Sequence, residues 1–335
     1  MFTMFPRHAH TRRCVVLFAG LAAWLTPVWP ASAQEAETQT VVAETQAAVT
    51  GSQSAATPWT HQEFAGDEQF HFAVVSDNAA NPRAGIFPAA VAKLQWLRPD
   101  FVLSVGDFIH GYGKDSQPLT DEAVVREKRR EFDAMLQGLS MPFYRVCGNH
   151  DLNNDVSAGI WKDLYGPSFY SFEYKNVLFI CLNSQDGKNH KAGISPDQIA
   201  WAKDTLAEHS DARWVCLFFH QPLWMEDDKR LDQAKDGDKP PSLTGFNEIE
   251  ELLAGRNYTV FAGHHHRYGK WIRNGNRYFR LATTGGQSAL GGPETGQFDH
   301  VAWVTMTDDG PVLCNLLLEG ILDEDAKRNM PLGTE

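Results

Sequence analysis

Side chains that bind metal ions occur in five short segments of this chain, and each segment follows a short apolar run. The segments are Asp77, Gly106-Asp107, Gly148-Asn149-His150-Asp151, His220 and Gly263-His264-His265-His266. Carboxylate, imidazole and amide ligands together suit borderline to hard divalent ions such as Fe, Mn, Zn or Mg. Two such ions about 4 Å apart lower the pKa of a bridging water and hold phosphoryl oxygens during in-line attack. The five segments therefore predict a metal centre with hydrolytic chemistry.

The apolar runs before these segments are predicted to be strands. They include Val74-Val75 before Asp77 and Val260-Phe261 before His264. In α/β sheets the carboxyl ends of strands converge on one rim, where the following loops build a binding site. Glycine directly precedes the first ligand of three segments, which allows tight turns and close approach of the backbone. We therefore expect all five segments to meet at one place.

The rest of the pattern predicts the fold class. Expected strands cover residues 70–75, 101–105, 143–147, 169–174, 177–182, 214–219, 258–262, 271–273, 277–282, 301–306 and 312–318. Helical periodicity occurs at 87–97, 121–136, after the Ser195-Pro196 start signal, and at 249–253. Strands and helices alternate early, and turn residues such as Asn274-Gly275 predict hairpins later. This order indicates an α/β fold, a layered sandwich of mixed β-sheets flanked by helices.

The order and spacing of four of these segments resemble the signature of the calcineurin-like metallophosphoesterases: Gly106-Asp107, Gly148-Asn149-His150-Asp151, His220 and Gly263-His264-His265-His266. The resemblance implies the fold of the calcineurin-like metallophosphoesterases. It also implies hydrolysis of phosphate esters with one or two divalent ions. It implies that Asp107 bridges two metals, that Asn149, His220 and His264 hold the second, and that Asp77 and His266 hold the first. It also implies that His150, oriented by Asp151, protonates the leaving group. A histidine beside a carboxylate independently suits proton donation.

One position departs from the family pattern. Ala79 stands where the family usually has a histidine that binds the first metal. Alanine has no ligand atom, so metal affinity at that position should be weaker or more permissive. Asn78, Asn81, His110 or a water molecule are the alternatives for filling the gap. A subgroup of the family has a residue other than histidine here, so the change is compatible with activity.

Several neighbouring residues have two interpretations. His265 lies between two ligands and is expected to point away from the metals, and His110 is expected either to line the cleft or to lie outside it. Arg83 and Arg267 are either phosphate ligands or solvated surface residues. Residues 224–239 are interpreted as an inserted loop that sets substrate specificity. Gly285-Gly286 and residues 291–300 are interpreted as an ordinary surface loop near the C-terminal strands, with a flexible loop over the site as the alternative.

The first 33 residues predict a secretory signal peptide. Arg7, Arg12 and Arg13 precede an apolar run from Cys14 to Leu25, and Ala31-Ser32-Ala33 provides a cleavage site. The run is shorter than the ~20 residues of a membrane-spanning helix. We therefore expect export to a periplasmic or extracellular location. Arg12-Arg13 also allows export of the folded chain by a twin-arginine route.

Composition divides the remainder into two parts. Residues 34–58 are rich in Ala, Thr, Gln, Glu and Ser, so they are predicted to be a flexible tether. Residues 59–335 are predicted to form one metallophosphoesterase domain. The excess of 42 acidic over 30 basic residues argues against duplex nucleic acid as a partner. The cysteines beyond the signal peptide lie in or beside apolar runs, which favours buried thiols: Cys147, Cys181, Cys216 and Cys314.

The sequence thus favours an exported hydrolase of small phosphomonoesters or phosphodiesters, in which a metal-activated hydroxide attacks phosphorus. Two alternatives remain open at this point. Loss of the ligand at Ala79 favours a secreted protein that binds metal or phosphate without catalysis. A nuclease would use the same chemistry on a different substrate. The sequence does not determine the oligomeric state.

Overall fold

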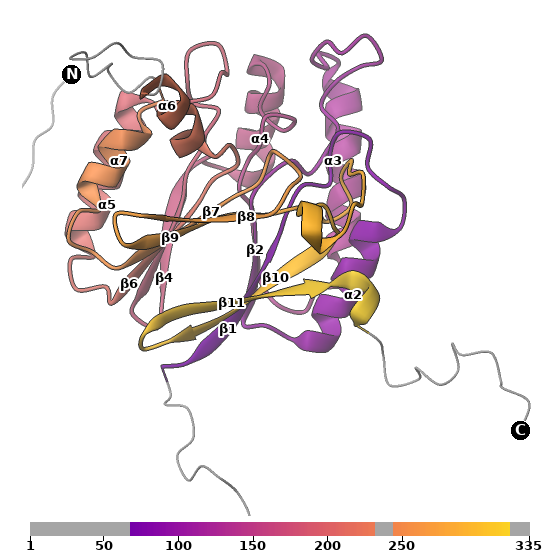
Figure 1. Ribbon diagram of the computed structural model, residues 1–335. Coiled ribbons are helices and arrows are strands. Elements are labelled where there is room, and N and C mark those ends of the chain that lie inside the picture. The colour runs from indigo at the N-terminus through magenta and orange to yellow at the C-terminus, as the bar shows by residue number, and fades with distance from the viewer. Residues whose placement is uncertain (1–67, 232–243, 322–335) are drawn as a thin grey trace, which may run out of the picture. The chain divides into compact units, whose positions relative to one another are not determined.

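A computed structural model describes residues 68–231 and 244–321 (Figure 1). The predicted signal peptide and the whole of the predicted tether lie outside these residues. One sheet contains β1 (Phe70–Val75), β2 (Phe101–Ser104), β3 (Phe143–Tyr144), β10 (His300–Thr307) and β11 (Gly310–Leu317). The other contains β4 (Tyr170–Tyr174), β5 (Val177–Cys181), β6 (Trp214–Phe218), β7 (Tyr258–Ala262), β8 (Gly269–Arg273) and β9 (Asn276–Arg280).

Both sheets are mixed, as predicted. The first has the strand order β11-β10-β1-β2-β3, and the second has the order β4-β5-β6-β7-β9-β8. Strands β1, β2 and β3 run parallel to one another, and so do β5, β6, β7 and β9. The antiparallel pairs are the predicted hairpins β4-β5, β8-β9 and β10-β11, together with the pairing of β1 and β10.

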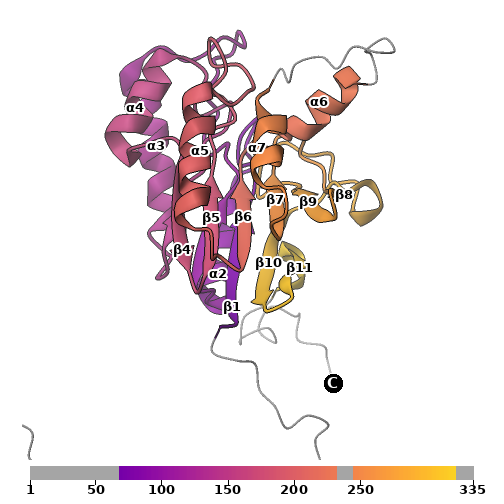
Figure 2. The ribbon, with the colours of Figure 1, turned by 90° about the vertical axis from the view of Figure 1, so that its left-hand side faces the viewer.

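Helices cover the outer face of each sheet (Figures 1 and 2). The helices are α2 (Ile86–Leu97), α3 (Glu122–Leu136), α4 (Asp155–Tyr165), α5 (Pro196–Glu208), α6 (Leu223–Leu231) and α7 (Phe246–Leu252), with short 3₁₀ helices at Pro293–Thr295 and Leu318–Gly320. Apolar side chains of α2, α3 and α4 pack against the first sheet, and those of α5, α6 and α7 pack against the second. The predicted layered sandwich is therefore confirmed.

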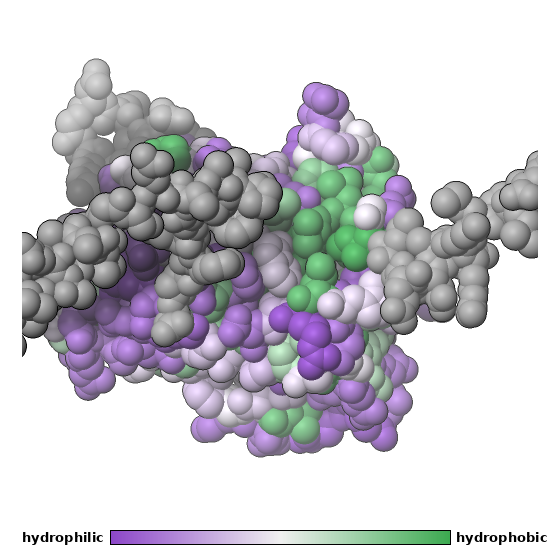
Figure 3. All heavy atoms as spheres, turned by 90° about the horizontal axis from the view of Figure 1, so that it is seen from below, coloured by the Kyte–Doolittle hydropathy of each residue, from purple (hydrophilic) through white to green (hydrophobic). Residues whose placement is uncertain are grey.

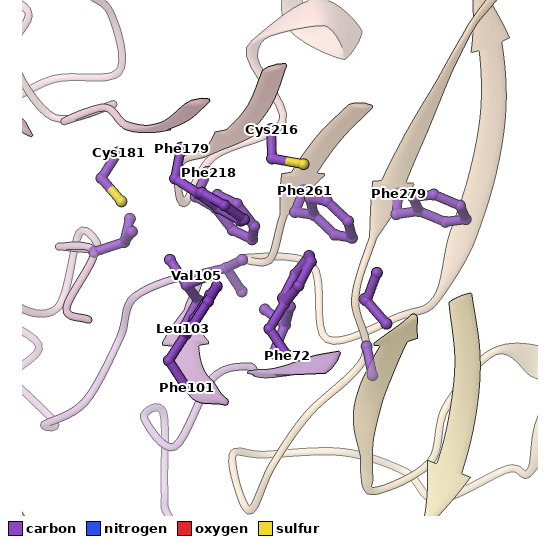
Figure 4. Close-up of a cluster of buried hydrophobic side chains, with 14 of the residues drawn as sticks. Phe72, Phe101, Leu103, Val105, Phe179, Cys181, Cys216, Phe218, Phe261 and Phe279 are labelled. Atoms are coloured by element: carbon purple, nitrogen blue, oxygen red, sulfur yellow. The ribbon is translucent and has the colours of Figure 1, made fainter. Parts of the chain in front are cut away.

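Aromatic side chains fill the space between the two sheets (Figure 4). Phe72 of the first sheet stacks on Phe101 with ring centroids 5.5 Å apart and meets Phe179 of the second sheet edge-on at 5.4 Å. Phe218 and Phe261, on neighbouring strands of the second sheet, stack at 4.7 Å. Offset stacking and edge-to-face contacts are the favoured arrangements of aromatic pairs. This core holds the two sheets face to face and so fixes how their rims meet.

Local sequence signals explain where several helices begin. The Asp121 side chain accepts hydrogen bonds from the backbone at the start of α3, and Ser195 does the same for α5, which has Pro196 at its first position. Helix α4 was not predicted, although Asn154 and Ser157 form a complete capping box at its start. Gly159 and the short apolar stripe of α4 obscure its periodicity.

Two structural expectations were wrong. Residues 224–239 were interpreted as an inserted loop, but Leu223–Leu231 form α6, whose Trp224 is fully buried against Phe219 and Phe246. Residues 232–239 lie outside the part of the chain that the structure describes. A tryptophan in the apolar interior anchors a helix rather than a surface loop. Cys314 was expected to be buried, yet it is exposed because β11 is an edge strand. Cys147, Cys181 and Cys216 are buried free thiols, as expected.

The described surface gives no sign of a membrane segment. Within residues 68–231 and 244–321, no helix is both long enough and apolar enough to cross a bilayer. Figure 3 views the face from which β1 starts, and its coloured part mixes hydrophilic and hydrophobic residues. The most exposed large apolar side chains lie in different places: Ile272 on β8, Val312 on β11 and Leu290 in the loop after β9. Such scattered exposure is normal for a protein surface.

Candidate metal centre

The carboxyl ends of parallel strands bring the predicted ligands to one rim. Asp77 follows β1, Asp107 follows β2, and Asn149 lies in the segment after β3. From the second sheet, His220 follows β6 and His264 follows β7. The backbone joins these loops across the sheets, because the nitrogen of His264 donates to Asp77 Oδ1 at 3.0 Å.

Four ligand atoms surround the Nε2 atom of His220. Asn149 Oδ1 lies at 3.0 Å, Asp107 Oδ2 and His264 Nδ1 at 3.2 Å, and Asp77 Oδ1 at 4.0 Å. Asp77, Asp107 and His220 are buried, and each offers a ligand atom within 4.8 Å of the other two. His266 Nε2 lies 3.2 Å from Asp77 Oδ1. All six predicted metal ligands therefore lie together.

Hydrogen bonds to the backbone orient two of the histidines. His220 Nδ1 lies 2.8 Å from the carbonyl oxygen of Val105, so this nitrogen carries the proton and donates. His266 Nδ1 donates to the carbonyl oxygen of Gln287 at 2.5 Å. In both rings the Nε2 atom then faces the carboxylates, where a metal ion can take the place of a proton. Metal-binding histidines typically donate their other ring N–H in this way, so the residues present fit a divalent ion.

Charge interactions among these side chains shift their pKa values. Burial alone would raise the pKa of Asp77 and of Asp107, but neighbouring histidines hold both below their ordinary value. Burial would lower the pKa of His220, yet the two carboxylates raise it to about 9. Burial lowers the pKa of His264 to about 3, so its ring is neutral. Without a metal ion and below about pH 9, His220 therefore carries a second ring proton, on Nε2. This positive charge lies where the carboxylates would attract a metal cation.

The stability of the metal-free protein should fall as pH rises from 6.5 to about 9. The pKa of His220 is raised from 6.5 to about 9 in the folded chain, so its stabilising proton is fully present below pH 6.5 and is lost as pH passes 9. The shift corresponds to about 3 kcal/mol. Because Mn²⁺ competes with this proton, stability in excess Mn²⁺ should instead rise over the same range. Denaturant unfolding at pH 6.5 and at pH 9 measures the free energy of unfolding with and without Mn²⁺. The same change with pH in both samples would contradict the prediction.

The backbone is strained at three ligands. Asp107, His264 and His266 have φ values of 60°, 75° and 51°, a region that residues other than glycine seldom occupy. Non-glycine residues in sparsely populated conformations cluster at functional sites, where the surroundings hold them in place. The strain at all three positions therefore supports a functional role for this cluster.

Glycine is required where the ligand loops touch. A Cβ atom at Gly148 would meet the Asp107 carboxylate and lie 2.6 Å from the Asp107 nitrogen. A Cβ atom at Gly263 would meet the Asp77 carboxylate and lie 2.9 Å from Val105 Cγ2. Both separations are shorter than real contacts of a Cβ atom. The glycines before Asn149 and His264 thus allow the close approach that the sequence predicted.

Asp151 is hydrogen-bonded to the backbone of two of the loops that carry predicted ligands. Its carboxylate accepts from the backbone nitrogens of Asp107 at 2.8 Å and Gly148 at 2.9 Å, and it pairs with the buried Arg129 at 3.2 Å. The sequence analysis assigned Asp151 to orienting the His150 ring. Within the described residues no hydrogen bond joins these two side chains, and His150 Nδ1 has no partner. The contacts make Asp151 a positioning residue for the backbone of both loops.

His150 lies at the edge of the cluster. Its Nε2 atom is 3.9 Å from Asp107 Oδ2, and its backbone nitrogen donates to Asp107 Oδ1 at 2.9 Å. Burial lowers the pKa of His150. The rings of Tyr112 and His110 lie 4.8 Å and 5.2 Å from its ring. His110, whose placement the sequence left open, therefore lies beside the proposed proton donor.

The position that departs from the family pattern is buried beside Asp77. Ala79 is fully buried, and its carbonyl oxygen accepts from the backbone nitrogen of Gln287 at 3.2 Å. Of the alternatives, Asn78 is buried and donates through Nδ2 to the carbonyl of Phe108 at 3.3 Å. Asn81 is exposed. The side of the cluster around Asp77 and His266 thus has fewer protein ligands than the side around His220.

The loop after β9 supports the centre, and the sequence analysis missed it. The Asp77 carbonyl oxygen accepts from the nitrogens of Thr284 at 3.1 Å and Gly286 at 2.9 Å, and the carbonyl of Gln287 orients His266. The interpretation of Gly285-Gly286 as surface loop is therefore wrong. Because β9 runs parallel to β7, its carboxyl end reaches the same rim. The apolar run before Gly285 was the available signal.

The two arginines have different surroundings. Arg83 binds both carboxylate oxygens of Asp299 at 2.6 Å and donates to the carbonyl of Gly286, so it fastens the loop after β9. Arg267 is exposed. His265 is also exposed, and its Nδ1 atom lies 3.0 Å from Arg280 Nη1. The arrangement agrees with the expectation that His265, which was not predicted to be a ligand, points away from the predicted metal ligands.

Carboxylate, imidazole and amide groups at the common rim of two sheets are the features of a metal-dependent phosphoester hydrolase. The chain belongs to the calcineurin-like phosphoesterase family, because the family model of that description matches residues 70–268, more than half of its 335 residues. The matched range contains all six ligands and His150. Members of this class depend on metal ions; the identity of the ion is a separate question.

Individual relatives agree with this assignment. The serine/threonine-protein phosphatase CPPED1 of Mus musculus is 30% identical over 186 residues, which cover 53% of this chain and 56% of that protein. The tartrate-resistant acid phosphatase type 5 of Mus musculus is 22% identical over 204 residues, covering 52% and 57%. The chain therefore spans about half the length of the curated relatives it matches.

Solved structures share the fold. The purple acid phosphatase PPD1 from yellow lupin superposes with a TM-score of 0.54 and 12% identity, covering 80% of this chain and 54% of that one. The structure of PhoD gives a TM-score of 0.53 and 14% identity, covering 74% and 68%. At this level of identity the comparison establishes the architecture alone.

Proposed function

We propose that this protein is an exported, metal-dependent phosphomonoesterase in which His150 protonates the leaving group. The observation that carries the proposal is the gathering of Asp77, Asp107, Asn149, His220, His264 and His266 with His150 at their edge. The names of the two phosphatase relatives favour monoesters over diesters. Comparing the hydrolysis of phenyl phosphate and bis(4-nitrophenyl) phosphate tests this choice, and faster turnover of the diester would reverse it.

Individual side chains have separate roles in the proposed reaction. Bound divalent ions would supply Lewis-acid stabilisation of the phosphoryl oxygens and an activated water. Asp107 positions His150 through the bond to its backbone nitrogen. The rings of His110 and Tyr112 limit the movement of the His150 ring and shield it from water. In the proposal, His150 Nε2 gives its proton to the departing alkoxide or phenoxide oxygen.

Replacing His150 by glutamine should slow esters of poor leaving groups most. Phenoxide needs a proton as the P–O bond breaks, whereas 4-nitrophenoxide leaves readily as an anion. We expect kcat/KM to fall about 10²-fold to 10³-fold for phenyl phosphate and by about tenfold for 4-nitrophenyl phosphate. His209→Gln, at the end of α5, is the matched control and should leave both rates unchanged. An equal fall in kcat/KM for the two esters would contradict a role of His150 as proton donor.

The protein should retain one metal ion tightly and a second weakly. Asp107, Asn149, His220 and His264 supply one full set of ligands, whereas Ala79 leaves the set around Asp77 and His266 one short. After exhaustive dialysis, elemental analysis should find about one ion per chain. Titration with Mn²⁺ should then reveal a second, weaker site. Two ions held with equal affinity would show that another group replaces the missing histidine.

A non-catalytic metal-binding protein is the second function considered, and Ala79 is the observation that favours it. His150 argues against it, because a protein that only binds metal or phosphate has no use for a proton donor at this edge. Measuring metal content and turnover on one sample separates the two functions. Bound metal with no hydrolysis of any phosphate ester would favour the binding protein.

We also propose that export removes the first 33 residues. The basic start, the apolar run and Ala31-Ser32-Ala33 support this. Expression of the full chain in a bacterial host should give a periplasmic product whose mass begins at Gln34. Changing Arg12 and Arg13 together to lysine should block this only if the twin-arginine route is used. A product that keeps its N-terminus would contradict cleavage.

The excess of 42 acidic over 30 basic residues supports a small substrate rather than nucleic acid. A nuclease would be recognised by binding to oligonucleotides that weakens steeply with salt. We expect no such binding to duplex DNA at physiological salt.

A further inference from the structure

A half-buried arginine lies at the rim that carries the metal ligands. Arg280 is the last residue of β9, and its backbone pairs with Ala262, the last residue of β7 (Figure 1). Neighbouring strands lie about 4.8 Å apart. Because β7 and β9 run parallel, their carboxyl ends reach the same rim, where His264 follows β7. A strand therefore fixes Arg280 close to the predicted ligands.

Four contacts orient the guanidinium group of Arg280. Nε donates to the carbonyl oxygen of Arg267 at 2.7 Å, and Nη1 donates to Nδ1 of His265 at 3.0 Å. Nη1 also lies 3.4 Å from the sulfur of Met225, and the guanidinium carbon lies 5.1 Å from the centre of the Trp271 ring. The first two contacts are with the ligand-bearing segment after β7. The guanidinium group is therefore held in place beside the metal centre.

One end of this guanidinium group is available to a ligand. Nη2 of Arg280 makes no hydrogen bond with the residues that the structure describes, and it is not one of the fully buried polar atoms that lack a partner. It is therefore open to solvent, and its N–H groups can donate. The exposed His265 lies beside it, and the ring of His265 is 5.1 Å from the ring of His264. A group bound at Nη2 would lie near the metal centre but outside its set of ligands.

The positive charge of Arg280 is not neutralised by any carboxylate in the described part of the chain. Glu226, on the neighbouring α6, already pairs with Lys229 at 2.8 Å. Burial lowers the pKa of Arg280, and the nearby charge of Arg267 lowers it further. The guanidinium group nevertheless stays charged at neutral pH. In a chain with a net charge of −12, two unneutralised arginines at this rim favour an anionic ligand.

We propose that Arg280, assisted by Arg267, binds a second anionic group of the substrate. The preferred substrates are then phosphomonoesters whose leaving group carries a carboxylate or a second phosphate. The inference rests on the proposed phosphoester hydrolysis and names its substrate class. Arginine binds carboxylates and phosphates through short, charge-assisted hydrogen bonds. The metal centre would hold the phosphate to be hydrolysed, while Arg280 would hold the other end of the substrate and so determine specificity.

Paired substrates that differ in charge test this inference. On the metal-loaded protein, 4-carboxyphenyl phosphate and 4-(2-carboxyethyl)phenyl phosphate are compared with their neutral primary amides. For at least one of the two lengths, kcat/KM should be about tenfold higher for the acid than for the amide, mainly through a lower KM. Arg280→Met should lower this ratio to about one. Arg280→Lys should keep part of the preference, because lysine retains the charge but loses the planar set of donors.

Arg277→Met is the matched control, because it removes the same charge from the same strand, near the other end of β9. Its ratio of acid to amide should equal that of the unmodified protein. A ratio near one for the unmodified protein at both lengths would overturn the inference, and so would a preference that Arg280→Met retains. If Arg280→Met does not fold, Arg280→Lys and Arg267→Gln decide the question. Both should lower the ratio, and an unchanged ratio in both would overturn the inference.

Binding of benzylphosphonates, which cannot be hydrolysed at the phosphorus–carbon bond, separates this inference from the proposed enzyme activity. Calorimetry on the Mn²⁺-loaded protein should show tighter binding of the acid phosphonates of the same two lengths than of their amides. Arg280→Met should remove the difference. If no ester is hydrolysed, the proposed function fails, and this binding difference still supports the anion site. Equal binding of acids and amides, with hydrolysis of the esters, would overturn the anion site and leave the phosphatase activity intact.

Discussion

Replacing Asp107 by asparagine should lower kcat/KM for phenyl phosphate by about 10³-fold or more without unfolding the protein. The Asp107 carboxylate is 1% exposed, lies 3.2 Å from His220 Nε2 through Oδ2, and accepts from the nitrogen of His150 through Oδ1. It therefore touches both the metal ligands and the proposed proton donor. Each 1.36 kcal/mol lost from transition-state stabilisation is a tenfold loss of rate.

The size of this effect follows from what asparagine keeps and what it loses. An amide oxygen still accepts from the nitrogen of His150, so the loop geometry is retained. The negative charge that attracts a cation is lost, and an NH₂ group stands beside His220 Nε2. Loss of metal-ion charge stabilisation costs several kcal/mol. Elemental analysis should accordingly find less bound metal as well as lower activity.

Asp211→Asn makes the same chemical change at an exposed position before β6 and serves as the control. Its activity and metal content should match the unmodified protein. Circular dichroism of both variants checks that the fold is kept. Full activity of a folded Asp107→Asn protein would refute the metal mechanism, because within residues 68–231 and 244–321 no other carboxylate lies within 4.0 Å of both His220 and His150.

The ligands could be predicted from the sequence because residue type and position carry the signal together. Asp77, Asp107, His220 and His264 each follow an apolar strand, and parallel strands place their carboxyl ends at one rim. Neither fact depends on knowing which strands are neighbours. The six predicted ligands therefore lie together in the structure, even though the end of β3 was placed three residues too late.

The supporting contacts could not be predicted in the same way. Thr284 and Gly286 hold Asp77 through backbone nitrogens, which every residue except proline possesses. Such bonds join residues about 200 positions apart and leave no mark on spacing or composition. Asp151 was placed at the centre correctly, but its role was wrong because a carboxylate after histidine suggests a side-chain pair. Only the three-dimensional path of the loops reveals that its partners are backbone groups and Arg129.

Replacing Arg129 by methionine should lower the free energy of unfolding by about 3–5 kcal/mol. The Arg129 and Asp151 side chains are 1% and 0% exposed, with Nη1 and Oδ1 3.2 Å apart, and Nη2 donates to the Asp151 carbonyl at 2.7 Å. Burial raises the pKa of Asp151 to about 6, although Arg129 opposes the rise, so the carboxylate is charged at pH 7. Removing one partner of a buried ion pair leaves the other charge uncompensated.

Arg126→Met is a closely matched control. Arg126 lies one turn earlier on α3 and also pairs with carboxylates, Glu122 at 2.8 Å and Asp163 at 2.7 Å, but these partners are exposed. Exposed pairs contribute little to stability, because water and salt screen them. The two variants lose the same charge and gain the same side chain on one helix. Urea unfolding at pH 7 compares them, provided that the m-values agree.

The Arg129 variant should also lose metal affinity, which a purely structural ion pair would not affect. Asp151 holds the backbone nitrogens of Asp107 and Gly148, so movement of its carboxylate displaces the loops that carry Asp107 and Asn149. Mn²⁺ titration of the folded variant, under conditions where unfolding is negligible, should give weaker binding than the Arg126→Met protein. If both variants lose the same stability and bind Mn²⁺ equally well, the buried pair does not position the metal centre.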